Sequence, residues 1–388
     1  YNFTLLYSSF KSKRMEVSKE LIYGLNDRPP LRETLFAALQ HLLAIFVAII
    51  TPPLIISSAL KFDLETTGFL VSMSLFVSGL ATFIQCKRLG PLGAGLLCIQ
   101  GTSFSFISPI IGAGMLGMVG GKMNVEMGLS YIFGACLVAA FVEMIVSRLL
   151  PYTRKIITPL VSGIVVSLIG MCLIKAGINS CGGGQSAIDA GTFGSMQNLG
   201  LAFLVLVSII FFNRSSNRFL RMASIVLGLL IGSIAAYALN MIDFSRISGA
   251  GTLNIPTPFK YGLHFDIGSI IGLGLIYLVT AVEAFGDITA NSLISGEPVE
   301  GSVFLKRAQG GILADGFNSF LAAIFNSFPN SIFAQNNGMI QLTGVASRYV
   351  GYFIAAALVL LGLFPVVGQL FSLIPDAVLG GATLLMFG

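Results

Sequence analysis

Residues 35–58, LFAALQHLLAIFVAIITPPLIISS, form an almost uninterrupted apolar run. A bilayer core of roughly 30 Å needs about 20 apolar residues in an α-helix, so this run is long enough to cross a membrane. The same reading of the whole chain predicts eleven spans and the start of a twelfth, at residues 35–58, 68–86, 92–112, 128–146, 156–175, 199–213, 219–241, 267–286, 310–327, 331–346, 350–371 and from 377 onward. The fold class is therefore predicted to be an all-α polytopic membrane protein.

The composition of the 388 residues agrees with this class. Hydrophobic residues make up 55% of the chain and charged residues only 10%, whereas soluble domains carry about 25% charged residues. A water-soluble enzyme, a disordered chain and a nucleic-acid-binding protein are thereby excluded. The five cysteines have no paired spacing and no Cys/His cluster is present, so we expect neither a disulfide framework nor a metal site.

The positive charges indicate how the spans are oriented. If the N-terminus is cytoplasmic, all but five of the 22 Lys and Arg residues fall in cytoplasmic loops, the exceptions being Lys61, Lys122, Lys175, Arg246 and Lys260. The positive-inside rule predicts this asymmetry, so the net charge of +5 reports topology and not an acidic ligand. Residues 1–34 lack the apolar region of a signal peptide and are predicted to form a cytoplasmic tail.

Two spans are interrupted by polar residues and glycine at matching positions. Gln100 lies 65 residues after the start of span one, and Gln335 lies 68 residues after the start of span eight. Because seven crossings separate these halves, they must have opposite orientations, which predicts an inverted repeat with a binding site at the two broken spans. The half-span Ala377–Gly388 leads us to expect a fragment that lacks its last two helices and part of another.

Four ionisable side chains in the spans are candidates for function, because each is costly at membrane depth. Glu283 and Asp287 are four residues apart and share one helix face. Asp315 is on span nine and His41 is on span one. For each of them an interhelical hydrogen bond is the structural alternative, and Asp287 could instead be hydrated near the cytoplasmic end of its span.

A fifth ionisable side chain, Glu143, is predicted to have a structural role. It lies near the cytoplasmic end of span four, and Arg148 follows it at a distance of five residues. We therefore expect an interfacial ion pair between these two residues, with a functional role for Glu143 as the less favoured interpretation.

The broken spans carry groups suited to a flat heterocycle. They read QGTSFSF from Gln100 and QNNGMIQLTG from Gln335. A glutamine amide offers an acceptor and two donors in one plane, which matches the imide edge of a pyrimidine or an oxidised purine. Glu283 adds an acceptor for a ring N–H, and Phe104 could stack on the ring, although packing is the commoner role for a phenylalanine.

The motif Gln335–Gly344 closely resembles the signature of the nucleobase–ascorbate transporter family. Further resemblance to this family, and within it to bacterial xanthine permeases, is carried by QH at 40–41, QGTSF at 100–104, GDITA at 286–290 and FPNSIFAQNNG at 328–338. The similarity runs from about Glu20 to Gly388.

The resemblance implies a fold of fourteen spans in two inverted repeats of seven. Residues 35–146 and 267–371 would form a core domain, and residues 147–266 would form a gate domain together with a second gate segment that starts at 372–388. Spans three and ten would each hold a short strand before a half-helix. Members of the family commonly import nucleobases with a proton and often work as homodimers.

Residue roles also follow from the resemblance. Glu283 and Gln335 would bind the base, with Phe104 and Ser105 beside it, and Asn336 would shape the site. The residues implied to support the site or the proton coupling are Asp315, Asp287, His41 and Gln100. Where this chain has Ser105, xanthine-selective relatives are expected to have Asn. The smaller residue leaves room at the far edge of a purine, so uric acid could also enter.

We therefore hypothesise a symporter of the bacterial inner membrane that imports xanthine with a proton and needs no cofactor. Glu283, in surroundings of low dielectric constant, would be competent to take up the proton, although Asp315 is an equal candidate. The alternatives are a uracil permease of the same family, a sulfate or bicarbonate carrier of related fold, and a membrane receptor that senses purines. A membrane enzyme is disfavoured because no nucleophile–base pair, metal cluster or phosphate loop is found.

Overall fold

The structure of the chain, a computed structural model, describes residues 21–153, 159–243, 253 and 255–387. Most of the predicted N-terminal tail and the first residues of the predicted fifth span, 156–158, lie outside the described residues. The same holds for the loop charges Arg154, Lys155 and Arg246.

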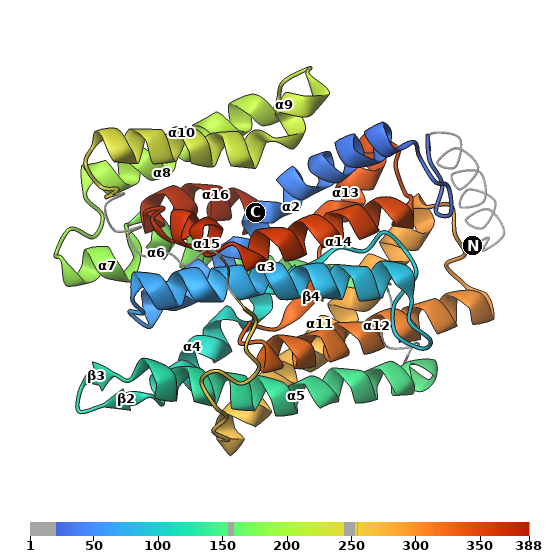
Figure 1. The fold of residues 1–388 in the computed structure, drawn as a ribbon, viewed down its shortest axis with the longest axis horizontal. Coiled ribbons are helices and arrows are strands. Elements are labelled where there is room, and N and C mark those ends of the chain that lie inside the picture. Colours follow the sequence, from blue (N-terminus) through green and yellow to red (C-terminus); the bar gives the residue numbers. More distant parts are fainter. Residues whose placement is uncertain (1–20, 154–158, 244–252, 254, 388) are drawn as a thin grey trace, which may run out of the picture.

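The described chain is mostly helical (Figure 1). Its helices are α2 (Leu31–Ala59), α3 (Leu64–Lys87), the 3-10 turn η1 (Phe104–Phe106), α4 (Ile107–Met115), α5 (Val125–Thr153), α6 (Pro159–Cys181), α7 (Gly184–Asp189), α8 (Met196–Asn213), α9 (Arg218–Met222), α10 (Ser224–Ala238), α11 (Ile267–Ile294), α12 (Gly301–Ile324), α13 (Ala334–Thr343), α14 (Arg348–Leu363), α15 (Pro365–Ser372) and α16 (Asp376–Phe387). Four short strands accompany them: β1 (Gln100–Thr102), β2 (Met118–Val119), β3 (Lys122–Met123) and β4 (Asn330–Ile332).

Several helices have the length and apolar composition of membrane spans. Among the described residues α2, α3, α5, α8 and α11 meet this description singly, and α14 with α15 meets it as a bent pair. Large apolar side chains also point outward, for example Phe203, Phe211 and Ile234, which are 69%, 72% and 68% exposed. An aqueous surface disfavours so much exposed apolar area, whereas lipid accommodates it.

The predicted span 350–371 is not one straight helix. It breaks at Phe364, where α14 and α15 meet at an angle of 79°. The physical cause is Pro365, which has no backbone N–H to continue the helix and pushes the preceding residue out of the helical region. Phe364 accordingly has extended dihedral angles, φ −95° and ψ 107°.

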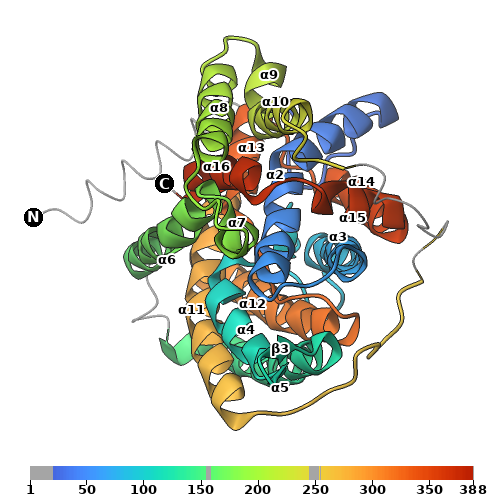
Figure 2. The same ribbon diagram turned by 90° about the vertical axis from the view of Figure 1, so that its left-hand side faces the viewer.

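The helices pack as a bundle, and each of its two sides is formed by a different set of helices. Helix α3 packs against α14 and α12, and α5 packs against α12 and α11. On the other side, α16 packs against α6 and α8, and α10 packs against α8. Figure 1 shows α8 and α10 along one edge of the bundle and α5 along the opposite edge. In the view of Figure 2, α3 and α10 are seen nearly end-on, with α2 between them.

Residues just before α2 are joined to the chain that follows α13. The backbone N–H of Ile22 donates to the carbonyl of Gly344 at 2.8 Å, and that of Ala346 donates to the carbonyl of Tyr23 at 2.9 Å. Arg28 donates to the Tyr349 hydroxyl at 2.9 Å. The last part of the predicted tail is thus tied to the segment between α13 and α14.

Close contact between α3 and α14 depends on glycine. A Cβ at Gly79 would lie 2.6 Å from the carbonyl oxygen of Ala355 and 2.8 Å from the backbone nitrogen of Val359. Backbone atoms cannot yield as a flexible side chain can, and small residues at helix interfaces in membranes permit this approach. The glycine at position 79 therefore sets how closely α3 and α14 pack.

We predict that Gly79→Ala destabilises the folded protein by about 1–3 kcal/mol, because the added methyl group pushes α14 away from α3. The measurement is thermal unfolding of the purified protein in detergent. Gly272→Ala on α11 is the matched control, since its Cβ meets nothing within 4 Å. That change should be neutral or stabilise by up to about 1 kcal/mol through helix propensity. Equal melting temperatures for the two variants would contradict the prediction.

Candidate functional site

Two short strands from distant parts of the chain meet in the interior of the bundle. Strands β1 and β4 pair antiparallel, with Gln100 opposite Ile332 and Thr102 opposite Asn330. Further hydrogen bonds extend the pairing, from Ser103 N to the carbonyl of Pro329 and from Phe333 N to that of Ile99, each at 2.9 Å. Strand β1 leads into η1 and α4, and β4 leads into α13. The pairing satisfies backbone groups that could not remain unpaired at this depth.

The paired strands β1 and β4 form a strand crossing, and a glycine in β1 allows it to pack closely against its neighbours. A Cβ at Gly101 would lie 2.6 Å from both the Phe333 ring and the Ile49 side chain. The strands therefore fit between α2 and the start of α13 without a side chain at this position. The residues that follow each strand, Phe104 and Ser105 after β1 and Gln335 after β4, are placed by this pairing.

Glu283 lies where α11 meets the end of β1. Its Oε2 accepts a hydrogen bond from the Ser105 hydroxyl at 3.4 Å, and α11 contacts η1, β4 and α13. Glu283, Ser105 and Phe104 are each partly exposed, and Gln335 is exposed on the first turn of α13. In the described part of the chain, these four accessible side chains lie on the elements that meet at the paired strands.

Gln100 and Asp315 form a buried network behind this site. The Gln100 amide nitrogen donates to Oδ1 of Asp315, and its amide oxygen accepts from Asn318 at 2.5 Å. The Gln100 backbone N–H donates to the Thr82 hydroxyl at 3.0 Å. Gln100 and Asp315 are fully buried, so their polar atoms face one another and not the accessible part of the site.

His41 and Asn336 form a second buried pair. His41 Nδ1 and Asn336 Oδ1 are 2.7 Å apart, and the Asn336 amide donates to the carbonyl of Leu97 at 2.5 Å. His41 Nε2 also lies 3.4 Å from the Thr343 hydroxyl. Both side chains are buried, and Asn336 joins α13 to α2 and to the chain before β1 through its two polar atoms.

Asp287 is one helical turn beyond Glu283 and is only 7% exposed. Within the described part of the chain, its Oδ2 has no hydrogen-bond partner. Its neighbour Asn291, which the sequence analysis did not single out, donates to the carbonyl of Leu97 and to Asn337, each at 2.9 Å. The signal that could have identified Asn291 is the spacing of polar residues by four along an apolar helix, at Glu283, Asp287 and Asn291.

The predicted ion pair between Glu143 and Arg148 is wrong. Glu143 is fully buried whereas Arg148 is exposed. The carboxyl group of Glu143 instead faces Asp315 on α12 and Thr280 on α11. A spacing of five residues turns the helix by about one and a half turns, which places these two side chains on different faces.

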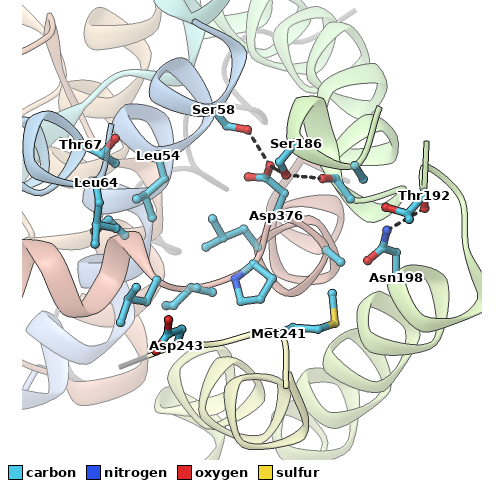
Figure 3. A pocket seen from close by; sticks show the side chains of 18 of the residues that line it. Leu54, Ser58, Leu64, Thr67, Ser186, Thr192, Asn198, Met241, Asp243 and Asp376 are labelled. Atoms are coloured by element: carbon cyan, nitrogen blue, oxygen red, sulfur yellow. Dashed lines mark hydrogen bonds between the residues drawn. The ribbon is translucent and has the colours of Figure 1, made fainter. Parts of the chain in front are cut away.

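A cavity of about 590 Å³ lies elsewhere, between the ends of several helices (Figure 3). Asp376, at the start of α16, lines the cavity and accepts hydrogen bonds from Ser58 at 2.6 Å and Ser186 at 3.3 Å. None of the nine candidate residues lines it. Its lining includes the amides of Asn198 and Asn240 and the ring of Phe62, but the Asn198 amide already donates to the carbonyls of Gly182 and Thr192.

An ion pair lies at the same end of the molecule. Lys61 Nζ is 2.8 Å from an oxygen of Asp189, and this contact holds the pKa of that exposed carboxyl below its ordinary value. It joins the loop after α2 to the end of α7. Within the described ranges, no group of three His, Cys, Asp or Glu side chains is placed to hold a metal ion.

Comparison of the sequence with known families and proteins gives strong matches. A family model described as "Permease family" matches residues 32–388. Xanthine permease XanP of Escherichia coli K12 is 50% identical over 372 residues, which cover 96% of this chain and 80% of that protein. Xanthine permease XanQ of the same strain is 48% identical over 368 residues, covering 95% and 79%. The uric acid-xanthine permease of Emericella nidulans is 33% identical over 393 residues, covering 94% and 68%.

Solved structures share the fold at low sequence identity. The transmembrane domain of the cyanobacterial bicarbonate transporter BicA matches with a TM-score of 0.61 at 16% identity, covering 93% of this chain and 90% of that one. SLC26A9 matches with a TM-score of 0.61 at 11% identity, covering 92% and 58%. The helical arrangement is thus that of a multi-pass membrane transporter, and the chain belongs to the permease family of nucleobase–ascorbate transporters.

Proposed function

We propose that this chain imports xanthine together with a proton across the bacterial inner membrane. The relatives with about half of their residues identical are named as xanthine permeases, and the chemistry at the strand crossing suits an oxidised purine. Like its relatives, the protein is a transporter and not an enzyme.

The observation that carries this proposal is the position of Glu283. Its carboxyl group contacts Ser105 at the end of β1 and is partly exposed, whereas Asp315 and Gln100 behind it are buried and bonded to each other. Glu283 is therefore the carboxylate that can accept a ring N–H from a purine. A hydrogen bond to a charged acceptor is worth about 1.5–3 kcal/mol, enough to orient the base.

Other side chains would complete the recognition. The exposed Gln335 amide, at the start of α13, can donate to a carbonyl and accept from an N–H on the same edge of a purine. Phe104, half-buried in η1, can stack against the face of the ring. Asn336 and His41 would act indirectly, since their hydrogen bond sets where α13 begins relative to α2.

Proton coupling would involve the same carboxyl groups. Glu283 and Asp287 lie on one face of α11, and Asp315 faces them from α12. Charging several carboxylates within one apolar environment is unfavourable, so uptake of a proton can be linked to binding of the base. Either Glu283 or Asp315 would carry the coupling proton.

Transport would proceed by movement of a core domain, residues 35–146 and 267–371, against a gate domain, residues 147–266 and 372 onward. The packing supports this division, because α16 contacts α6 and α8, whereas α3 contacts α14 and α12, and α5 contacts α12. Binding would stabilise one arrangement of the two domains over the other. A cytoplasmic N-terminus, an inverted repeat of seven spans and a homodimer complete the proposal.

The main rival within the shared fold is an anion carrier, because the solved structure of similar fold is a bicarbonate transporter. The partly exposed carboxyl group of Glu283 disfavours it, since a carboxylate at the binding position repels an anion. A uracil permease and a purine-sensing receptor remain rivals that transport measurements distinguish.

We predict uptake of radiolabelled xanthine by cells that express this protein. Uptake should be abolished by a protonophore and reduced by unlabelled uric acid but not by uracil or bicarbonate. The physical reason is that bicarbonate lacks the imide edge that Gln335 would bind, and that uracil shares this edge but lacks the fused five-membered ring of a purine. Uptake of radiolabelled uracil in place of xanthine would overturn the substrate assignment.

We predict that Glu283→Gln lowers the affinity for xanthine roughly 10- to 100-fold, because the charged acceptor of the ring N–H is lost. Binding to purified protein and uptake in cells measure this effect. Glu300→Gln is the matched control, since it makes the same chemical change at an exposed residue just before α12. Unchanged proton-driven uptake by Glu283→Gln would show that this carboxylate has no coupling role.

We predict that Ser105→Asn keeps xanthine uptake and weakens competition by uric acid about 5- to 100-fold, because the larger side chain fills space beside the purine. Ser105→Ala is the control, since it removes the hydrogen bond to Glu283 without adding volume. The inhibition constants of uric acid for the two variants are the measurement. Equal constants would mean that residue 105 does not border the 8-position of the base.

A further inference from the structure

Helices α5 and α12 touch through their backbones beside two buried carboxyl groups. A Cβ at Gly316 would lie 3.0 Å from the backbone nitrogen of Met144 and 3.1 Å from the carbonyl oxygen of Ala140. Glu143 and Asp315 directly precede Met144 and Gly316 in the sequence. The close approach at Gly316 therefore brings the side chains of Glu143 and Asp315 into one small space between the helices.

The two carboxyl groups face each other across the contact between α5 and α12. Both residues are 0% exposed. In the described part of the molecule, neither oxygen of Glu143 accepts a hydrogen bond, and Oδ2 of Asp315 has none either. Oδ1 of Asp315 does accept one, from the amide of Gln100. Both carboxyl oxygens of Glu143 and Oδ2 of Asp315 are thus buried together without a hydrogen-bond donor.

No cation compensates for this arrangement among the groups that act on the pair. The charged groups that act on Glu143 are Asp315 and Glu283, and those that act on Asp315 are Glu143 and Glu283. From α11, Thr280 also faces Glu143, while its hydroxyl donates to the Tyr277 carbonyl at 3.3 Å. The Tyr277 hydroxyl is buried in the same region and has no partner among the described residues. Cys136 on α5 is a further titratable neighbour of Tyr277.

Two facing carboxylates cannot both be ionised in such surroundings. Burying one unpaired charge is already costly, and a second like charge in contact adds to that cost. A single proton removes the repulsion, because one carboxyl group then donates a short O–H···O⁻ hydrogen bond to the other. Carboxylate pairs elsewhere share one proton for the same reason.

The hydrogen bonds indicate where the proton lies. Asp315 accepts from Gln100, which stabilises a negative charge on Asp315. Glu143 has no donor among the described side chains, so it is the better site for the proton. In this arrangement Glu143 donates to Oδ2 of Asp315, and Gln100 donates to Oδ1.

We propose that Glu143 is a positioning residue that carries a proton, donates it in a hydrogen bond to Asp315 and so holds Asp315 against Gln100 of strand β1. The role for transport rests on the proposed function, in which Asp315 supports the substrate site. Loss of this hydrogen bond would free the Asp315 carboxylate to turn away from Gln100 and would loosen the strand crossing from the side of α12.

Infrared spectroscopy of the purified full chain tests the location of the proton without relying on transport. A protonated carboxyl group has a C=O band distinct from that of a carboxylate. Glu143→Gln should remove one such band at neutral pH, and Asp315→Asn should shift the same band because the acceptor has changed. Glu126→Gln is the matched control, since Glu126 is exposed on the first turn of the same helix. If Glu143→Gln leaves the protonated-carboxyl bands of the wild type unchanged, the proposal is wrong.

Xanthine binding and the pH profile of uptake test the positioning role. Glu143→Gln retains a donor for Asp315, so xanthine affinity should stay within about threefold of the wild type, whereas Glu143→Ala should lose roughly tenfold or more. The pH profile of uptake should shift in Glu143→Gln and stay unchanged in Glu126→Gln. Equal affinity for the Gln and Ala variants would overturn the positioning role.

These measurements separate the two proposals. If the wild type takes up no xanthine, the proposed function fails, while the infrared result still decides whether Glu143 carries a proton. If Glu143→Gln does not fold, Glu143→Asp replaces it. This variant keeps a protonatable group on a shorter side chain, and its band should move in frequency. An unmoved band there would likewise overturn the assignment of the proton to residue 143.

Discussion

The antiparallel pairing of Gln100–Thr102 with Asn330–Ile332 joins two interrupted segments in the interior of the bundle. A membrane-spanning segment that leaves the helical conformation exposes backbone N–H and C=O groups that lipid cannot satisfy. Here each broken segment satisfies those of the other. Both can then turn directly into short helices, which places Phe104, Ser105 and Gln335 just after the paired strands, with Ser105 in contact with Glu283. Without the pairing, these side chains would have no fixed relation to one another.

Buried polar groups surround this crossing on several sides and tie it to the long helices. His41 and Asn336 connect it to α2, Asn291 and Asn337 connect it to α11, and Gln100 with Asp315 connects it to α12. In an apolar environment an unsatisfied polar group is costly, so each network fixes the position of its helix. The pair Glu143–Asp315 extends this support to α5, provided that one proton is shared.

The fold and the specificity of this transporter have different origins. Proteins that are 16% and 11% identical to the chain share its helical arrangement, and one of them is named as a bicarbonate transporter. If the proposed function holds, the same arrangement serves substrates of different charge. Under the proposed function, the side chains at the crossing would decide between substrates, and a partly exposed carboxylate at Glu283 would favour a neutral heterocycle with N–H donors over an anion.

Apolar runs such as 35–58 and 128–146 identify membrane helices from the sequence alone, because the bilayer imposes a minimum apolar length; the structure has α2 and α5 there. Spacing by four along an apolar helix likewise singles out Glu283 and Asp287. The partner of Glu143, the burial of Asn336 and the bend at Phe364 became clear only in the tertiary structure. Sequence spacing describes neighbours on one helix, whereas these features depend on contacts between residues far apart in the chain, such as Glu143 with Asp315 and His41 with Asn336. Those contacts exist only once the helices have packed.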